Sequence, residues 1–163
     1  MALTGLVIWA LVLVVAHSGQ REEQPEGAGK QAVVRVDPVL DNKIALAKTL
    51  LSDNNVEQAD KLLAELIATY PFEAMPYLLK GDLALYRQDP VAAMLAYRQA
   101  VDLNPDFLDK KAPLFQGKKI KKTVEEARGL IESGLAAKAG DAGLLEARKV
   151  YYYMLRKIAG SCG

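Results

Sequence analysis

The chain has 163 residues, of which 51% are hydrophobic and 25% charged, and its formal net charge is +1. A chain of this length is expected to form one modest domain with a hydrophobic core. The small net charge gives no general attraction to nucleic acid, which we do not expect as a partner. Because Cys162 is the only cysteine, an intramolecular disulfide is excluded.

Residues 1–20 contain no Lys, Arg, Asp or Glu. A membrane span needs about 17–25 apolar residues, and the stretch from Met1 to Gly19 is long enough. We expect a single-pass transmembrane anchor, with a cleaved signal peptide and a buried helix as the alternatives. Ala16-His17-Ser18 offers the small residues that a signal-peptide cleavage site needs, but no basic residue precedes the apolar run, as a signal peptide would require. Acidic residues follow the span, so the domain is expected on the periplasmic or extracytoplasmic side.

Residues 21–36 are charged and contain Pro25 and several glycines, a composition typical of an extended tether. The first helix is predicted to begin at Asp37-Pro38, where Asp caps and Pro occupies the first turn. The same pairing at Asp89-Pro90 predicts the start of a later helix. Apolar residues then recur at helical spacing until Asp53-Asn54-Asn55. Asn55 and Gln58 predict a capping box at the start of the next helix.

Residues 74–105 follow one known repeat pattern closely. That pattern runs W-x₂-L-G-x₂-Y, then A-x₃-F, then P, with a period of 34 residues. Tyr77 and Gly81 stand at the Trp and Gly places, Ala93 and Tyr97 form the Ala-aromatic pair, and Pro105 closes the unit. Lys80 and Ala84 depart from the pattern. The stretch resembles a tetratricopeptide repeat.

The 34-residue period extends beyond this unit. Ala59, Ala93 and Ala127 follow one another at that spacing, as do Pro71 and Pro105. Small alanines allow two antiparallel helices to approach closely. The resemblance therefore implies an all-α fold, an antiparallel helix-hairpin solenoid over 37–163 that follows the transmembrane helix. Its expected parts are repeats at 40–73 and 74–107, a degenerate third repeat at 108–141 and a capping helix at 142–159.

The pattern changes after Pro105. Pro113 and Gly117 interrupt the place of a first helix, so a short irregular segment is expected there. Thr123 to Glu126 predicts a capping box and the start of a helix. Gly140 is expected to end that helix, and Asp141 to cap the last one. Terminal repeats are usually atypical because they cover the core.

No enzymatic chemistry is indicated. His17, the only histidine, lies within or beside the apolar segment, so a histidine-based metal site or triad in the folded part is excluded. The scattered glycines follow no predicted strand and suggest no phosphate loop. We expect no catalytic residue, cofactor, metal or small-molecule substrate.

The resemblance implies a groove lined by the first helix of each repeat, which holds a protein segment. An apolar helix or strand is the favoured ligand; the Lys-Asn-Arg clamp of chaperone-binding members is missing. Packing of some groove residues by the tether or the third unit is the alternative. The predicted groove residues are Ile44, Lys48, Leu51, Met75, Leu78, Asp82, Leu85 and Tyr86.

Two further surfaces stand out. The first is a basic run that comprises Lys110, Lys111, Lys118, Lys119, Lys121 and Lys122. This run is either a solvated loop or a surface that meets anionic lipid or an acidic partner. The second is Tyr151-Tyr152-Tyr153. Successive helical side chains point about 100° apart, so at least one tyrosine should reach the surface and be able to dock a partner.

The sequence thus predicts a membrane-anchored adaptor or accessory subunit, which holds its repeat domain within a larger membrane or periplasmic complex. The alternative is a periplasmic assembly factor that captures client chains. Small anchored repeat proteins that this chain resembles serve in this way in cytochrome maturation and secretion.

Overall fold

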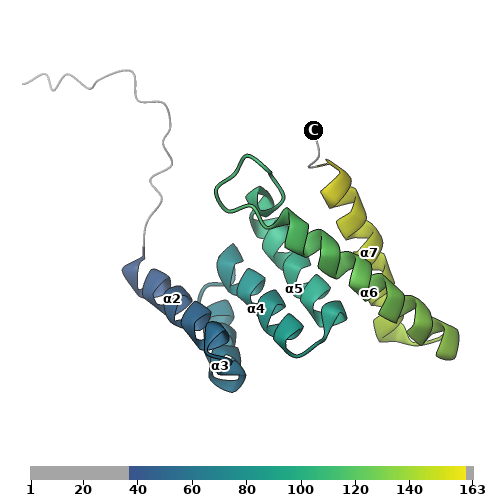
Figure 1. Cartoon of the computed structure of the whole chain (residues 1–163), viewed down its shortest axis with the longest axis horizontal. Coiled ribbons are helices and arrows are strands. Elements are labelled where there is room, and N and C mark those ends of the chain that lie inside the picture. The colour runs from purple at the N-terminus through teal and green to yellow at the C-terminus, as the bar shows by residue number, and fades with distance from the viewer. Residues whose placement is uncertain (1–36, 161–163) are drawn as a thin grey trace, which may run out of the picture. The chain divides into compact units, whose positions relative to one another are not determined.

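The computed structural model describes residues 37–160, and in this range the chain is all-helical, without a strand (Figure 1). This confirms the expected all-α class. The elements are α2 (Pro38–Ser52), α3 (Val56–Thr69), α4 (Ala74–Tyr86), α5 (Pro90–Leu103), the 3₁₀ helix η1 (Pro105–Phe107), α6 (Gly117–Ala137) and α7 (Ala142–Gly160). None of these helices is long and apolar enough to cross a membrane. The expected anchor, tether and Cys162 lie outside the described residues.

Three helices begin at the aspartates that the sequence predicts as caps. The Asp37 carboxylate accepts a hydrogen bond from the Val39 amide at 2.9 Å, and Asp89 accepts one from Ala92 at 2.9 Å. Asp141 likewise accepts one from the Leu144 amide at 3.1 Å. Asn55 precedes α3 as expected, but its side chain makes no capping hydrogen bond, so the predicted capping box is wrong.

The turns after α2 and α4 have the same geometry. After α2, the amides of Asn54 and Asn55 donate to the carbonyls of Leu51 and Leu50, and Asn54 has a φ of 56°. After α4, the same two hydrogen bonds form around Gln88, whose φ is 58°. Both are Schellman turns, in which a left-handed residue ends the helix and satisfies its last carbonyls. The chain reverses at each one, so α2–α3 and α4–α5 form two similar helix pairs.

The predicted helix start at Thr123 is wrong. Helix α6 begins at Gly117 and runs unbroken through Thr123, which is 2% exposed. The Thr123 hydroxyl donates to the Lys119 carbonyl at 3.1 Å, one turn back along the same helix. Burial explains the difference, because Ile120 and Val124 are both fully buried and extend the apolar face toward Gly117. The irregular segment is confined to residues 108–116.

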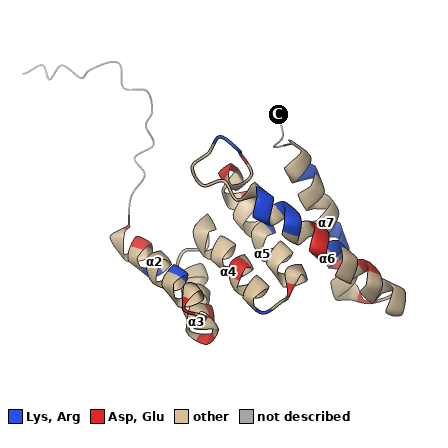
Figure 2. Ribbon diagram, viewed as in Figure 1, with Lys and Arg blue, Asp and Glu red and all other residues tan. Residues whose placement is uncertain are grey.

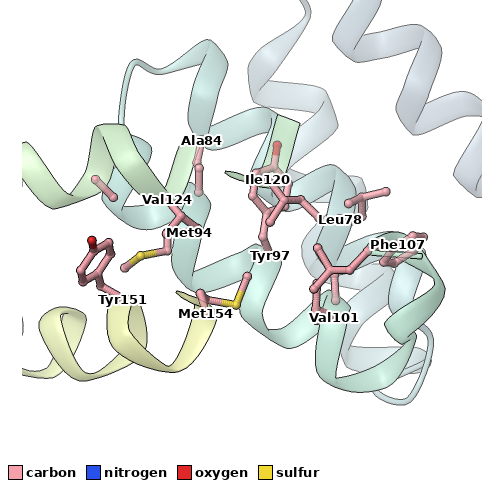
Figure 3. Packing of buried hydrophobic residues seen from close by; sticks show 14 of the residues in the cluster. Leu78, Ala84, Met94, Tyr97, Val101, Phe107, Ile120, Val124, Tyr151 and Met154 are labelled. Atoms are coloured by element: carbon pink, nitrogen blue, oxygen red, sulfur yellow. The ribbon is translucent and has the colours of Figure 1, made fainter. Parts of the chain in front are cut away.

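The core consists of two clusters, and α4 contributes to both. The smaller cluster joins α2 and α3 to Leu79 and Leu83 of α4. The larger one surrounds Tyr97 of α5, with residues of α4, α6 and α7 packed around it (Figure 3). The three alanines at 34-residue spacing, Ala59, Ala93 and Ala127, are all fully buried. Ala127 nevertheless lies in α6. That helix follows η1 and the 108–116 segment, whereas α3 and α5 each follow a Schellman turn.

Candidate binding groove

A continuous hollow runs over one face of α2, α4 and α6. It consists of two adjoining hollows of about 460 and 270 Å³, which share Lys48, Leu79, Asp82 and Lys119 as lining residues. The larger hollow is further lined by Leu51, Ser52, Leu85 and Tyr86. The smaller one is further lined by Met75, Leu78, Phe107, Pro113, Leu114 and Gln116. We call this hollow the groove.

All the predicted groove residues except Ile44 line the groove. Ile44 lies half-buried against the α2–α3–α4 cluster. The sequence missed residues from later parts of the chain, above all Lys119 of α6 and Leu114 of the 108–116 segment. Lys119 was missed because residues 117–122 were expected to lie outside a helix, so no position of α6 was assigned to the groove. Leu114 was missed because a short irregular segment was expected there, and the groove was expected to be lined by helices.

The middle of the groove carries a polar cluster centred on Asp82. Its carboxylate accepts hydrogen bonds from the Tyr97 hydroxyl at 2.5 Å and from Lys119 Nζ at 2.6 Å. The Lys119 ammonium also lies 5.6 Å from the centre of the Tyr97 ring. Burial, reinforced by Asp82, raises the pKa of Tyr97 far above its ordinary value, so the phenol stays protonated as a donor. The cluster ties α4, α5 and α6 together.

Lys48 is the third charged residue of the groove, after Asp82 and Lys119. It is exposed, and within residues 37–160 it takes part in no ion pair. Lys119, by contrast, is neutralised by Asp82. The groove therefore presents apolar walls, one compensated ion pair and one uncompensated ammonium group to a ligand.

The lysines of the predicted basic run lie in the 108–116 segment and at the start of α6 (Figure 2), and their side chains fall into two groups. Lys119 turns into the groove, whereas the other five lysines are exposed. Lys118, Lys121 and Lys122 are three and four residues apart, so they share one face of α6. Lys110 and Lys111 lie in the 108–116 segment, which precedes that helix.

The three tyrosines of α7 point in different directions, as their helical spacing requires. Tyr151 is buried in the core, and Tyr152 is 54% exposed. The hydroxyl of Tyr153 donates to Asp102, and its ring lies 5.5 Å from the Arg98 guanidinium carbon. Of the predicted docking tyrosines, Tyr152 is therefore the one that offers a large free aromatic surface.

A second hollow of about 620 Å³ lies between η1 and the end of α7. It is lined by residues of both charges, including Asp106, Asp109, Lys111, Arg156 and Lys157. Within residues 37–160, His, Cys, Asp and Glu form no group of three or more that is placed to hold a metal ion.

Comparison with known proteins gives no relative. No protein-family model, no curated protein and no solved structure matches this chain.

Proposed function

We propose that this chain is a membrane-anchored adaptor or accessory subunit, whose tetratricopeptide-like body binds a segment of a partner protein in the groove. The observation that carries the proposal is the gathering of the predicted α2 and α4 side chains around one hollow. In this proposal residues 1–20 form the anchor, and the body lies on the periplasmic or extracytoplasmic side as part of a larger complex.

The lining of the groove favours an apolar ligand segment. Leu51, Leu79 and Leu85 form its apolar wall, and Tyr86 is 51% exposed beside them. Aromatic side chains at the edge of an apolar hollow are frequent hot spots of binding. The free ammonium of Lys48 adds a preference for an acidic residue in the segment. A partner helix or strand with apolar anchors and one nearby carboxylate fits these features.

Site-specific photo-crosslinking in native membranes tests the proposal. A photoreactive phenylalanine analogue replaces Tyr86 in the full chain, and the matched control carries it at Phe72, which is 85% exposed between α3 and α4. We expect a discrete covalent product from position 86 and not from position 72. Tyr86→Ala should also weaken co-purification of that partner about tenfold or more, because truncating a hot-spot aromatic costs at least about 2 kcal/mol.

The pattern of products distinguishes the possible outcomes. A single product of constant mass supports a subunit of a fixed complex. Many weak products that disappear when export of new chains is blocked support the assembly factor instead. Equal crosslinking from positions 86 and 72 would show that the groove is not the binding surface.

A further inference from the structure

The exposed lysines of the basic run are poorly compensated by the rest of the body. Residues 110–122 contain six lysines and no acidic residue. Lys119 is paired with Asp82, and Lys122 lies 3.6 Å from Glu126 in an exposed pair of the kind that contributes little. In residues 37–160 the other four make no ion pair. The nearest acids along the chain are Asp106 and Asp109 before the run and Glu125 after it.

The position of these lysines does not favour the stability of α6. Lys118, Lys121 and Lys122 lie in its first two turns, where the unpaired amide groups already give the helix a partial positive charge. The first turn contains no acidic residue. Folding therefore gives no reason for lysines at this end, whereas an external anionic surface would.

An exposed apolar side chain lies between the two groups of lysines. Leu114 is 43% exposed. Its segment is held in place because Phe107 and Leu108 are buried and the Gln116 amide donates to the Phe107 carbonyl at 2.7 Å. A leucine flanked by lysines on a fixed segment suits the boundary between lipid headgroups and acyl chains.

The two groups of lysines lie close together in the fold. Figure 1 shows the 108–116 segment beside the start of α6. In the proposed function residues 1–20 span a bilayer, so a lipid surface is available to the body of the same chain.

We propose that Lys110, Lys111, Leu114, Lys118, Lys121 and Lys122 form a docking surface for anionic phospholipid headgroups. The inference rests on the proposed anchor. Of the five lysines, Lys111 lines the hollow between η1 and α7, and the other four line neither that hollow nor the groove. Their charge is therefore presented on exposed side chains rather than gathered in one of these hollows. Such a surface suits many headgroups better than a single acidic protein segment. Each lysine should strengthen binding about fivefold at low salt.

Fluorescence of the full chain, reconstituted into vesicles, tests the docking surface. Leu114→Cys in a Cys162→Ser background carries an environment-sensitive dye. The vesicles contain phosphatidylcholine alone or with phosphatidylglycerol. We expect a blue shift and quenching by lipid-attached quenchers only with phosphatidylglycerol, reversed by high salt. The same dye at Leu130, which is 50% exposed on α6, should respond equally in both vesicles.

A matched pair of charge variants locates the effect. Lys→Gln substitution at positions 110, 111, 118, 121 and 122 should abolish the response. Glutamine at Lys61, Lys80, Lys138, Arg148 and Lys149, which are also exposed, should preserve it. Unchanged thermal unfolding of both variants would show that each still folds.

Three results would overturn the proposal. These are equal responses in both vesicle types, equal loss in the two charge variants, and a dye response to soluble polyglutamate without one to phosphatidylglycerol. The last would assign the surface to an acidic protein. Failure of the anchor is detected separately, because an unanchored chain would not float with vesicles of phosphatidylcholine alone.

Discussion

At the residue scale, the Gly and aromatic places of the sequence pattern are explained by one contact. A Cβ atom at Gly81 would overlap the ring of Tyr97, which is fully buried against that helix. Gly81 is therefore selected for space, although glycine lowers helix stability by about 1 kcal/mol relative to alanine. The same ring carries the hydroxyl that donates to Asp82 in the groove.

Gly81→Ala should destabilise the protein by about 1–3 kcal/mol, because overpacking outweighs the gain in helix propensity. Denaturant unfolding of the full chain in mild detergent measures the change. A smaller residue in place of the ring should relieve the overlap, so Gly81→Ala should cost less in a Tyr97→Leu background. Additive effects of the two substitutions would contradict this account.

A second residue contact predicts a pH effect. The Tyr70 hydroxyl donates to Asp37 at 3.0 Å, and this bond, followed by that of the Val39 amide, holds the pKa of the Asp37 carboxyl below its usual value. A carboxyl with a lowered folded-state pKa contributes stability above its ordinary pKa and loses it as the pH falls through the folded value. Tyr70→Phe should therefore destabilise the protein at neutral pH, and the difference from wild type should shrink on acidification.

Unfolding midpoints across the acidic range measure this difference. Tyr77→Phe is the matched control, because the Tyr77 hydroxyl donates to the Pro71 carbonyl, which does not titrate. Its effect should stay constant as carboxylates are protonated. A pH-independent effect of Tyr70→Phe would show that the Asp37 contact contributes nothing through protonation.

At the element scale, the two Schellman turns make α2–α3 and α4–α5 similar, but they place different residues in the left-handed conformation. Asn54 is among the residues that tolerate it, whereas Gln88 bears the steric cost of a Cβ atom at a φ of 58°. Gln88→Gly should therefore stabilise the protein by about 0.5–1 kcal/mol, after the extra chain entropy of glycine is deducted.

The matched control is Gln99→Gly, an exposed position inside α5, which should destabilise by about 1 kcal/mol. Thermal unfolding of both variants measures whether each substitution raises or lowers the stability of the protein. Destabilisation by both substitutions would show that chain entropy, rather than backbone strain at position 88, dominates.

At the scale of the whole molecule, α4 connects the parts that the proposed function needs. It contributes Leu79 and Leu83 to one core cluster and Leu78 and Ala84 to the other, and Asp82 of the same helix lies in the groove. A change at the Asp82–Lys119 pair is thus linked to α5, against which α4 and α6 both pack. The docking surface lies on α6 and the segment before it, so the groove and the proposed membrane contact share one helix.

Local sequence signals determined where several helices of this protein begin. Aspartate followed by proline located the starts of α2 and α5, and Asp141 located the start of α7, because a cap needs only its own side chain and the next few amides. The tetratricopeptide resemblance pointed to Lys48, Leu51, Met75, Leu78, Asp82, Leu85 and Tyr86, which line the groove, and also to Ile44, which does not, while it missed Ser52 and Leu79.

Only the tertiary structure decided the course of α6 and its part in the groove. Residues 117–122 look polar along the sequence because four of the six are lysines, yet packing against α5 and α7 buries Ile120 and continues the helix back to Gly117. That helix brings Lys119 to Asp82, a partner 37 residues away. Local periodicity carries no information on such a contact, because it depends on which helices pack together.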